Sequence, residues 1–400
     1  MPPLSTPLAR TASAVLLVLG AACTETSIPS IASPDAATLS QGNGAGNLLD
    51  GAVYTQTDAI GNMVVAYYRA TDGTLSPAGS FATGGNGSNG NLPGQGSVVL
   101  SGAASAEVSV GANQLLFVTN TGSNTLSVFR IEPHSLVLAS TAGTDGSRPV
   151  SVTVHHDLVY VVNQGSANIT GFRVSSQGEL TPIPGSTRSL TSPVSNPAQV
   201  GFSPDGKFLV TEGRESQIID TYLVDENSGL VSGPHANITR GPEPFSFTFD
   251  RKGHLFMTEG HFVAPGAGTT SSYDILGDGS LQAISSAVPN FQGVPCWVVI
   301  ADNQKVIYEA NAVSSTVSSY TVNADGSLVL KESVAGTTGS FPGAGAIDLA
   351  LTKGSRILYS LSASLNGGTI VAFAVNADNT LTALGNQANL PPTVSGLAAR

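Results

Sequence analysis

Charge is scarce in this chain of 400 residues. Charged residues make up 11% of it, and 16 Lys and Arg stand against 27 Asp and Glu, which gives a net charge of −11. This balance argues against a nucleic acid partner, because an excess of basic residues is needed to replace phosphate counterions. The negative charge is more simply a feature that keeps a protein soluble.

The N-terminal apolar stretch is too short to cross a membrane. Thr11–Ala22 follows Arg10 and has twelve residues, whereas a spanning helix needs about 20. Its layout is typical of a cleavable signal peptide, so we predict that residues 1–22 are removed on export. Residues 23–50 are rich in Ser, Thr, Ala and Gly and are expected to form a flexible tether.

Cysteine is almost absent, and the two cysteines are expected to have different roles. Cys23 follows Leu19-Gly-Ala-Ala, which resembles a bacterial lipoprotein processing site with the leucine displaced by one position. Cys23 is then the acylated first residue of a membrane-attached protein in the periplasm or at the cell surface; the alternative is ordinary secretion. With Cys23 acylated or removed, Cys296 has no partner, and the fold must stand on packing alone. Cys296 lies in the apolar run VPCWVVI, which favours a buried inert thiol over a nucleophile.

Glycine is abundant, with 46 residues, and many turns with few charges indicate an all-β protein. A short apolar run followed by a small or polar break recurs seven times, in steps of 43 to 63 residues. A period of about 50 residues built from short strands is the signature of a β-propeller in which each repeat is one blade. We therefore predict one domain over 51–400, a seven-bladed β-propeller with four antiparallel strands in each blade. The third apolar residues of the runs are Tyr54, Phe117, Tyr160, Val210, Met257, Tyr308 and Tyr359.

The two ends of the repeat region predict how the ring closes. Pro391–Arg400 resembles the first strands of the other blades, whereas the first repeat begins with its second strand at Gly51. We expect the C-terminal strand to pair with the first blade and to hide exposed strand edges. Ala82–Gly102 contains GGNGSNGNLPGQGS and is interpreted as a loop inserted in the first blade. We expect the closed ring to be a monomer.

Polar residues at two kinds of position should gather at one face of the ring. In a propeller, the start of each first strand and the end of each second strand lie on the same side, so residues of different blades converge on the channel mouth. The candidates at second-strand ends are Asn120, Asn163, Glu212, Arg214, Glu259, His261, Glu309 and Asn311. Those just before first strands are Arg148, Asn196, Glu243 and Gln292.

Glu212 and Glu259 carry the strongest chemical signal in this set. They occupy the same place in adjacent blades, inside a repeated Thr-Glu-Gly, and each is followed two residues later by Arg214 or His261. Carboxylates that lie close together can share a proton, and one of them can then act as a general acid or base. Arg148 or Arg214 is suited to bind a substrate carboxylate through two hydrogen bonds. Our candidate site has Glu212, Glu259 and His261 as catalytic residues and Arg148, Arg214, Asn163 and Glu243 as substrate-binding residues. The alternative is that these residues only satisfy the junctions between blades.

No metal or organic cofactor is expected from the sequence. The six histidines show no ligand spacing, and the adjacent His155 and His156 are interpreted as structural. Aspartates before glycine, such as Asp278 and Asp325, serve tight turns, and the spacing of a calcium loop is absent. The motifs Gly-x-Ser-x-Gly and His-Glu-x-x-His are absent as well.

The segment FSPDGKFLVTEG at Phe202–Gly213, the strand rhythm and the DGSL turns resemble the lactonase family of seven-bladed propellers. The resemblance covers essentially all of residues 51–400 and extends to bacterial 6-phosphogluconolactonases and fungal 3-carboxy-cis,cis-muconate cyclases. It implies a lactone-handling site at the channel mouth, built from Arg, His and Glu without a metal. Active members often have a histidine directly after the proline that opens a first strand. The residues in that place here are Val150, Ala198, Phe245 and Cys296.

This departure from the family pattern leaves Glu212, Glu259 or His261 as the general base, or leaves no catalysis. We expect an exported lactonase-like propeller that hydrolyses or forms the lactone ring of a small carboxylated substrate. Export argues against the phosphorylated sugar lactone of central metabolism, which is cytoplasmic. The alternatives are a propeller of the cell envelope that binds a ligand or a partner without turnover, and a purely structural surface protein.

Overall fold

All regular elements of the described chain are β-strands. The computed structural model describes residues 46–90, 94–101, 114–260, 264, 266–339, 345–364 and 367–400. No helix in this part of the chain is long and apolar enough to cross a membrane. The predicted signal peptide, Cys23, most of the tether and His261 lie outside the described residues.

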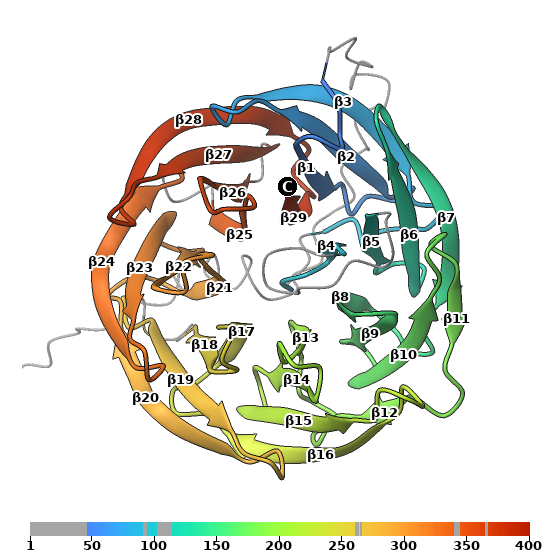
Figure 1. The fold of residues 1–400 in the computed structure, drawn as a ribbon, viewed down its shortest axis with the longest axis vertical. Helices are drawn as coiled ribbons and strands as arrows, with labels where there is room; N and C mark the ends of the chain where they lie inside the picture. The colour runs from blue at the N-terminus through green and yellow to red at the C-terminus, as the bar shows by residue number, and fades with distance from the viewer. Residues whose placement is uncertain are drawn as a thin grey trace, which may run out of the picture.

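The strands form seven antiparallel sheets in a ring around a central channel (Figure 1), which confirms the predicted seven-bladed β-propeller. We number the sheets as blades 1 to 7 in chain order and give their strands from the channel outwards. Blade 1 has β29 (Ser395–Ala399), β1 (Ala52–Gln56), β2 (Met63–Arg69) and β3 (Leu75–Ala82). Blade 2 has β4 (Val98–Leu100), β5 (Leu115–Asn120), β6 (Thr125–Glu132) and β7 (Ser135–Gly143). Blade 3 has β8 (Pro149–His155), β9 (Leu158–Asn163), β10 (Asn168–Val174) and an outer strand split into β11 (Leu180–Pro182) and β12 (Arg188–Ser189).

The remaining four blades repeat the plan without interruption. Blade 4 has β13 (Val200–Phe202), β14 (Phe208–Gly213), β15 (Ile218–Val224) and β16 (Val231–Ile238). Blade 5 has β17 (Pro244–Phe249), β18 (Leu255–Glu259), β19 (Thr269–Ile275) and β20 (Leu281–Pro289). Blade 6 has β21 (Pro295–Ile300), β22 (Val306–Asn311), β23 (Thr316–Val322) and β24 (Leu328–Thr337). Blade 7 has β25 (Gly345–Leu351), β26 (Ile357–Ser364), β27 (Gly367–Val375) and β28 (Leu381–Leu390).

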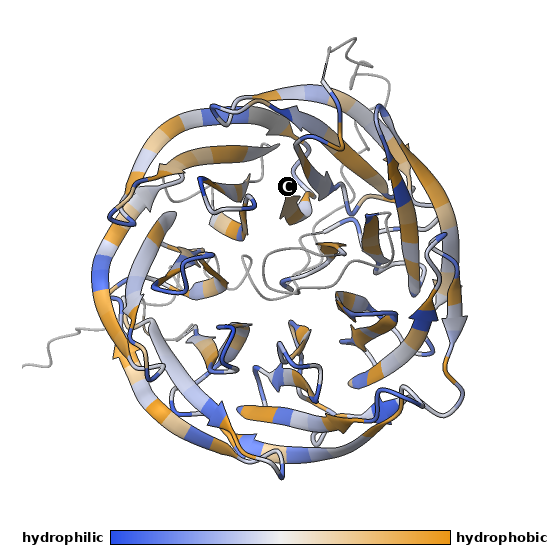
Figure 2. Ribbon diagram, viewed as in Figure 1, coloured by the Kyte–Doolittle hydropathy of each residue, from blue (hydrophilic) through white to orange (hydrophobic). Residues whose placement is uncertain are grey.

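The second strand of a blade is buried on both faces, because each sheet packs between two neighbouring sheets. Every residue of β9 and β22 is buried, which explains why the repeat is marked by continuous apolar runs rather than by alternation. The outer strands face solvent on one side, and Figure 2 shows them as mixtures of apolar and polar residues. The core therefore lies between the blades and not in the channel.

Three of the four tyrosines that mark the repeat tie their blade to the next one. Tyr160, Tyr308 and Tyr359 are fully buried, and each donates its phenolic proton to a carbonyl in the turn between the third and fourth strands of the following blade. The acceptors are Gly229, Asn379 and Gly73, at 2.7, 2.9 and 2.7 Å respectively. A buried phenol is stabilised by such a partner, so the positions of these three tyrosines in the repeat reflect contacts between blades.

Blade 1 is closed by the C-terminal strand, as predicted. β29 pairs antiparallel with β1, with Tyr54 opposite Ala398. The guanidinium of Arg69 adds a hydrogen bond from Nε to the carbonyl oxygen of Arg400, at 2.7 Å. β1 thus has a partner strand on each side, and the ring has no open edge there.

The described part of the inserted loop reaches across the central channel. Gly96 O accepts the N–H of Val152 in blade 3 at 2.8 Å. The side-chain amide of Gln95 donates to Val298 O at 2.9 Å and accepts from Val298 N at 3.1 Å. Val298 belongs to blade 6, so this short segment links inner strands on different sides of the channel and fills part of it.

Candidate functional site

The carboxylate of Glu212 is bound inside blade 4. Its side chain is fully buried, and Oε1 accepts the N–H of Ala198 at 2.5 Å while Oε2 accepts the N–H of Gln199 at 3.2 Å. The carboxylate therefore supplies acceptors for main-chain donors just before β13. Burial raises the pKa of Glu212 well above its usual range, and the two amides and the charge of Arg214 offset part of that shift.

Glu259 and Glu309 are buried carboxyl groups of blades 5 and 6. The donors to Glu259 are the N–H of Gly241 and the hydroxyls of Thr269 and Ser271, at 2.7, 2.5 and 2.6 Å. The donors to Glu309 are the hydroxyl of Thr270 and the amide of Asn290. Burial raises the pKa of Glu259, and it raises the pKa of Glu309 to about 8, with repulsion from Glu259 adding to the second shift. The structure thus brings Glu259 together with Glu309, whereas Glu212 is held by a separate set of donors.

Arg148 and Glu243 share an uncommon backbone geometry before the first strands of their blades. Arg148, Asn196, Glu243 and Val294 have φ angles of 58°, 51°, 55° and 56°. A left-handed φ is uncommon for residues other than glycine. Each of these residues precedes the proline at the start of the inner segment in blades 3 to 6. The geometry is therefore a repeated part of the propeller, and it gives Arg148 and Glu243 equivalent places in two blades.

Arg214 occupies a position whose equivalents connect neighbouring blades. Thr121 and Gln164, at the same place in blades 2 and 3, donate to the carbonyls of Pro149 and Pro197, both at 3.0 Å. The guanidinium of Arg214 lies over the ring of Phe245 in blade 5, 5.0 Å from its centroid. Arg214 thus bridges blades 4 and 5 through a cation–π contact.

Asn163, a predicted substrate-binding residue, donates hydrogen bonds to neighbouring groups of the protein. Its side chain is fully buried, and Nδ2 donates to Thr144 O at 3.0 Å and to Asn168 Oδ1 at 2.9 Å. Cys296 is buried, as the sequence predicted, and forms no disulfide with a described residue.

Asp58 is a candidate that the sequence filter missed. It comes two residues after β1, at the position in blade 1 that Arg214 has in blade 4. Its carboxylate accepts the N–H and the hydroxyl of Ser88 at 3.1 and 2.5 Å. Burial raises the pKa of Asp58 to about 7, while Ser88 and the charge of Arg148 lower it. Counting four residues on from Tyr54, as from the other repeat markers, would have found Asp58.

A cavity lies in the central channel, at the end where the first strands finish. Its polar lining includes Gln95, Thr153, His155, Gln199, Thr248 and Asp348. The described candidates Glu212, Glu259, Arg148, Arg214, Asn163 and Glu243 do not line it. Asp348 is almost fully buried, and Oδ1 accepts the N–H of Leu349 at 2.7 Å. Its other oxygen has no partner in the described residues, and burial raises the pKa of Asp348 well above its usual range.

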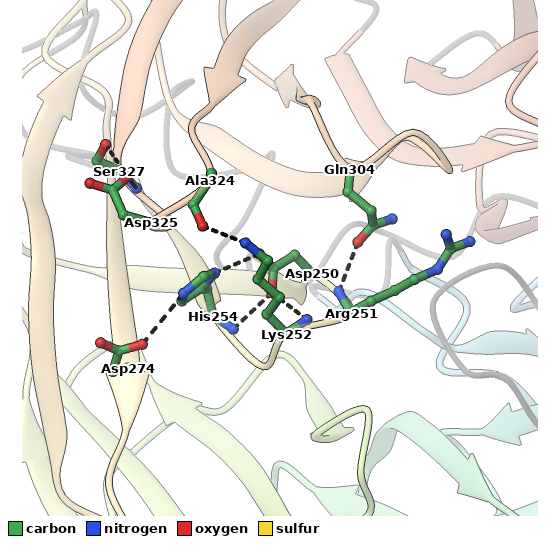
Figure 3. Close-up of polar contacts among 9 residues, drawn as sticks. All are labelled: Asp250, Arg251, Lys252, His254, Asp274, Gln304, Ala324, Asp325 and Ser327. Carbon is green, nitrogen blue, oxygen red and sulfur yellow. Dashed lines mark hydrogen bonds and ion pairs between the residues drawn. The ribbon is translucent and has the colours of Figure 1, made fainter.

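A polar cluster at the same end of the ring joins blades 5 and 6 (Figure 3). His254 Nδ1 lies 2.6 Å from Asp250 Oδ2, and Nε2 lies 3.6 Å from Asp274 Oδ1. Lys252 Nζ donates to Ala324 O in the β23–β24 turn at 2.6 Å. Both ring nitrogens of His254 therefore have carboxylate partners, and the cluster has a structural role between the blades.

The sequence resembles known lactonases over part of its length. Residues 51–194 match the family model described as Lactonase, 7-bladed beta-propeller. The 6-phosphogluconolactonase of Yersinia pestis is 20% identical over 157 residues, which are 37% of this chain and 47% of that protein. These findings support a lactonase-family propeller. The chain spans about half the length of the curated relatives that it matches.

Solved structures resemble this propeller over most of its length. A protein from Lactobacillus plantarum superposes with a TM-score of 0.66 at 15% identity and covers 88% of this chain and 99% of its own. The periplasmic gluconolactonase of Pseudomonas aeruginosa superposes with a TM-score of 0.63 at 17% identity and covers 86% and 98%. At these identities the likeness shows the fold.

Proposed function

We propose that this protein is an exported lactonase that hydrolyses, or forms, the lactone ring of a small carboxylated substrate. The observation that carries the proposal is the buried carboxyl group of Asp58, whose pKa burial raises to about 7 and which is influenced by the charge of Arg148 from blade 3. A general base works best when its pKa lies near the working pH. The resemblance to lactonases supplies the substrate class.

In the proposed hydrolysis, the carboxylate accepts a proton from water, and the oxygen of that water attacks the lactone carbonyl. The ring C–O bond then breaks, and the proton passes to the departing alkoxide, which leaves a hydroxy acid; ring formation is the reverse. Arg148 binds the substrate carboxylate. Glu212, Glu259 and His261 are the other acid–base candidates, and Arg214, Asn163 and Glu243 are the other substrate-binding candidates.

Binding without turnover is the second candidate function. It is favoured by Asp58, Glu212 and Glu259, whose carboxylate oxygens all accept hydrogen bonds from donors of the protein. A ligand of the cell envelope, or a partner, would then occupy the ring without being converted.

Export is proposed from the N-terminal stretch Thr11–Ala22 and from Cys23. A likeness to a periplasmic gluconolactonase is consistent with it. Cell fractionation of the wild type and of Cys23→Ala tests it: a lipid anchor predicts membrane association that the variant loses. Membrane association of both forms would contradict acylation at Cys23, and retention in the cytoplasm would contradict export.

The enzymatic proposal is tested by hydrolysis of a panel of neutral and carboxylated lactones, corrected for spontaneous opening. Asp58→Asn should abolish turnover, whereas Arg148→Gln should raise KM for carboxylated lactones more than for neutral ones. A Glu212→Gln/Glu259→Gln double variant tests the other carboxylates, with the exposed Glu215→Gln as control. If Asp58→Asn still turns over a lactone and the double variant does not, the general base is Glu212 or Glu259 and not Asp58. No turnover of any lactone, with a lactone still raising Tm, would establish the binding function.

A further inference from the structure

Three side chains of types that can ligate a metal meet at the channel end opposite the Asp58–Arg148 region. His155 ends β8, His156 follows it in the β8–β9 turn, and Glu226 lies in the β15–β16 turn of blade 4. One ligand atom from each residue lies within 4.8 Å of those of the other two. His155 is buried and lines the central cavity, whereas His156 and Glu226 are exposed. At this spacing of the ligand atoms, one ion can contact His155, His156 and Glu226 after small movements of the two exposed side chains.

One arginine holds the two turns that carry these residues. Arg173 NH1 donates to Asp157 Oδ1 at 2.7 Å, next to His156 in the β8–β9 turn. Arg173 NH2 donates to the main-chain carbonyls of Glu226 and Asn227, at 2.7 and 3.0 Å. The turns of blades 3 and 4 are therefore fixed relative to each other before any ion binds, which lowers the entropy lost on binding.

The space between His155 and Glu226 is kept open by a glycine. A Cβ atom added at Gly206 would collide with His155 Nε2 and lie 2.9 Å from Glu226 Oε1. Nε2 and Oε1 are 3.6 Å apart, a separation close to that of two ligands on one tetrahedral ion. The imidazole of His155 also packs against Phe202, with centroids 5.6 Å apart, which fixes its orientation.

His156 has the backbone of a constrained residue. Its φ is 53°, in the left-handed region, and its ring centroid lies 4.3 Å from that of His155. Strained backbone in a non-glycine residue is a reason to look for function.

We propose that His155, His156 and Glu226 bind one divalent transition-metal ion of the Zn²⁺ type. Two imidazoles and a carboxylate are the ligand set that such ions prefer, and three protein ligands leave a position open for water or a ligand at the cavity mouth. His254 provides the contrast, because its two nitrogens already face Asp250 and Asp274. The site is independent of the proposed lactonase function, since it lies at the other end of the channel.

The test is a calorimetric titration of the full chain, without a polyhistidine tag and after chelator treatment, with Zn²⁺ at neutral pH. We expect one ion per chain and a rise in Tm on binding. His156→Asn, whose side chain tolerates a left-handed φ, and Glu226→Gln should each weaken affinity by roughly 10-fold or more. Both substitutions are at exposed positions, so the variants should fold. His235→Asn, at another exposed histidine, is the matched control and should bind like the wild type.

Co²⁺ gives a second measurement, because its absorption bands report nitrogen and oxygen ligation directly. We expect these bands in the wild type and in His235→Asn, and their loss in His156→Asn. The proposal is overturned if the chain binds neither ion, or if His156→Asn and Glu226→Gln bind Zn²⁺ as tightly as the wild type. Lactone turnover is not part of the readout, so its absence leaves this test unaffected.

Discussion

Tyr54 of β1 lies opposite Ala398 of β29, which joins the two ends of the domain in one sheet. Leu397 of the same strand and Val394 just before it are buried as well. The C-terminal residues therefore supply both strand hydrogen bonds and apolar burial to blade 1.

Deletion of residues 391–400 should sharply lower stability. The loss of one buried leucine alone costs about 2–5 kcal/mol, and β1 would also become an edge strand. We expect a large fall in Tm by calorimetry and a tendency to aggregate, while Lys353→Gln in an exposed turn should melt like the wild type. A truncated chain that melted unchanged would contradict the closure.

Stability should fall as pH rises from 6.5 to 8. Asp58 and Glu309 have folded pKa values of about 7 and 8, above the unfolded values of 3.8 and 4.5. In this window the folded state therefore binds more protons than the unfolded state, and each added pH unit favours unfolding. The two groups together predict a loss of roughly 2 kcal/mol. The pKa of His155 is lowered in the folded state, so its titration makes stability rise with pH. This opposite effect belongs to the pH range below about 6.5, the unfolded pKa of histidine.

Denaturant titrations at constant ionic strength across this window measure the effect. Glu309→Gln, which cannot ionise, should make the fall in stability with pH less steep. A stability that is flat or rises between pH 6.5 and 8 would show that these carboxyls are not protonated in the folded state.

Glu212→Gln should destabilise the fold by about 1–3 kcal/mol. Both carboxylate oxygens accept main-chain N–H groups, and an amide can offer only one oxygen, so either Ala198 or Gln199 loses its acceptor. Urea unfolding of the variant beside Glu215→Gln measures the difference. Equal stability of the two variants would mean that these amides have other acceptors.

Gly206→Ala should cost more stability than Gly253→Ala. Both glycines have left-handed φ angles, of 70° and 95°, in the corresponding turns of blades 4 and 5. A Cβ at Gly253 meets nothing within 4 Å, whereas at Gly206 it meets the buried His155. Both substitutions place an alanine at a left-handed φ, so they share that backbone cost. The difference between their losses of unfolding free energy, about 1–3 kcal/mol for an overpacked site, therefore measures the crowding at His155. Equal unfolding midpoints for the two variants would contradict it.

The sequence predicted the architecture because each blade repeats the same local pattern. Seven apolar runs recur at a regular period with turn residues between them. Each run specifies a strand that is buried on both faces only when a blade packs on each side of it. The strand Pro391–Arg400 was recognised by the same pattern. Both predictions hold in the structure.

The candidate site was less accessible to sequence analysis. The repeat placed Glu212 and Arg214 at strand ends correctly, but their partners, the amides of Ala198 and Gln199 and the ring of Phe245, depend on how segments pack. Asp58 was overlooked, although it has the same place in blade 1.

The sequence by itself determined which residues form strands, how many blades there are and how the ring closes, because these follow from periodic burial along the chain. Only the tertiary structure decided which polar groups meet. Glu226 lies far from His156 in the sequence and comes near it through the packing of blade 4 against blade 3. Likewise, burial and not residue type raises the pKa of Asp58 to about 7. Desolvation and contacts between blades depend on the complete ring.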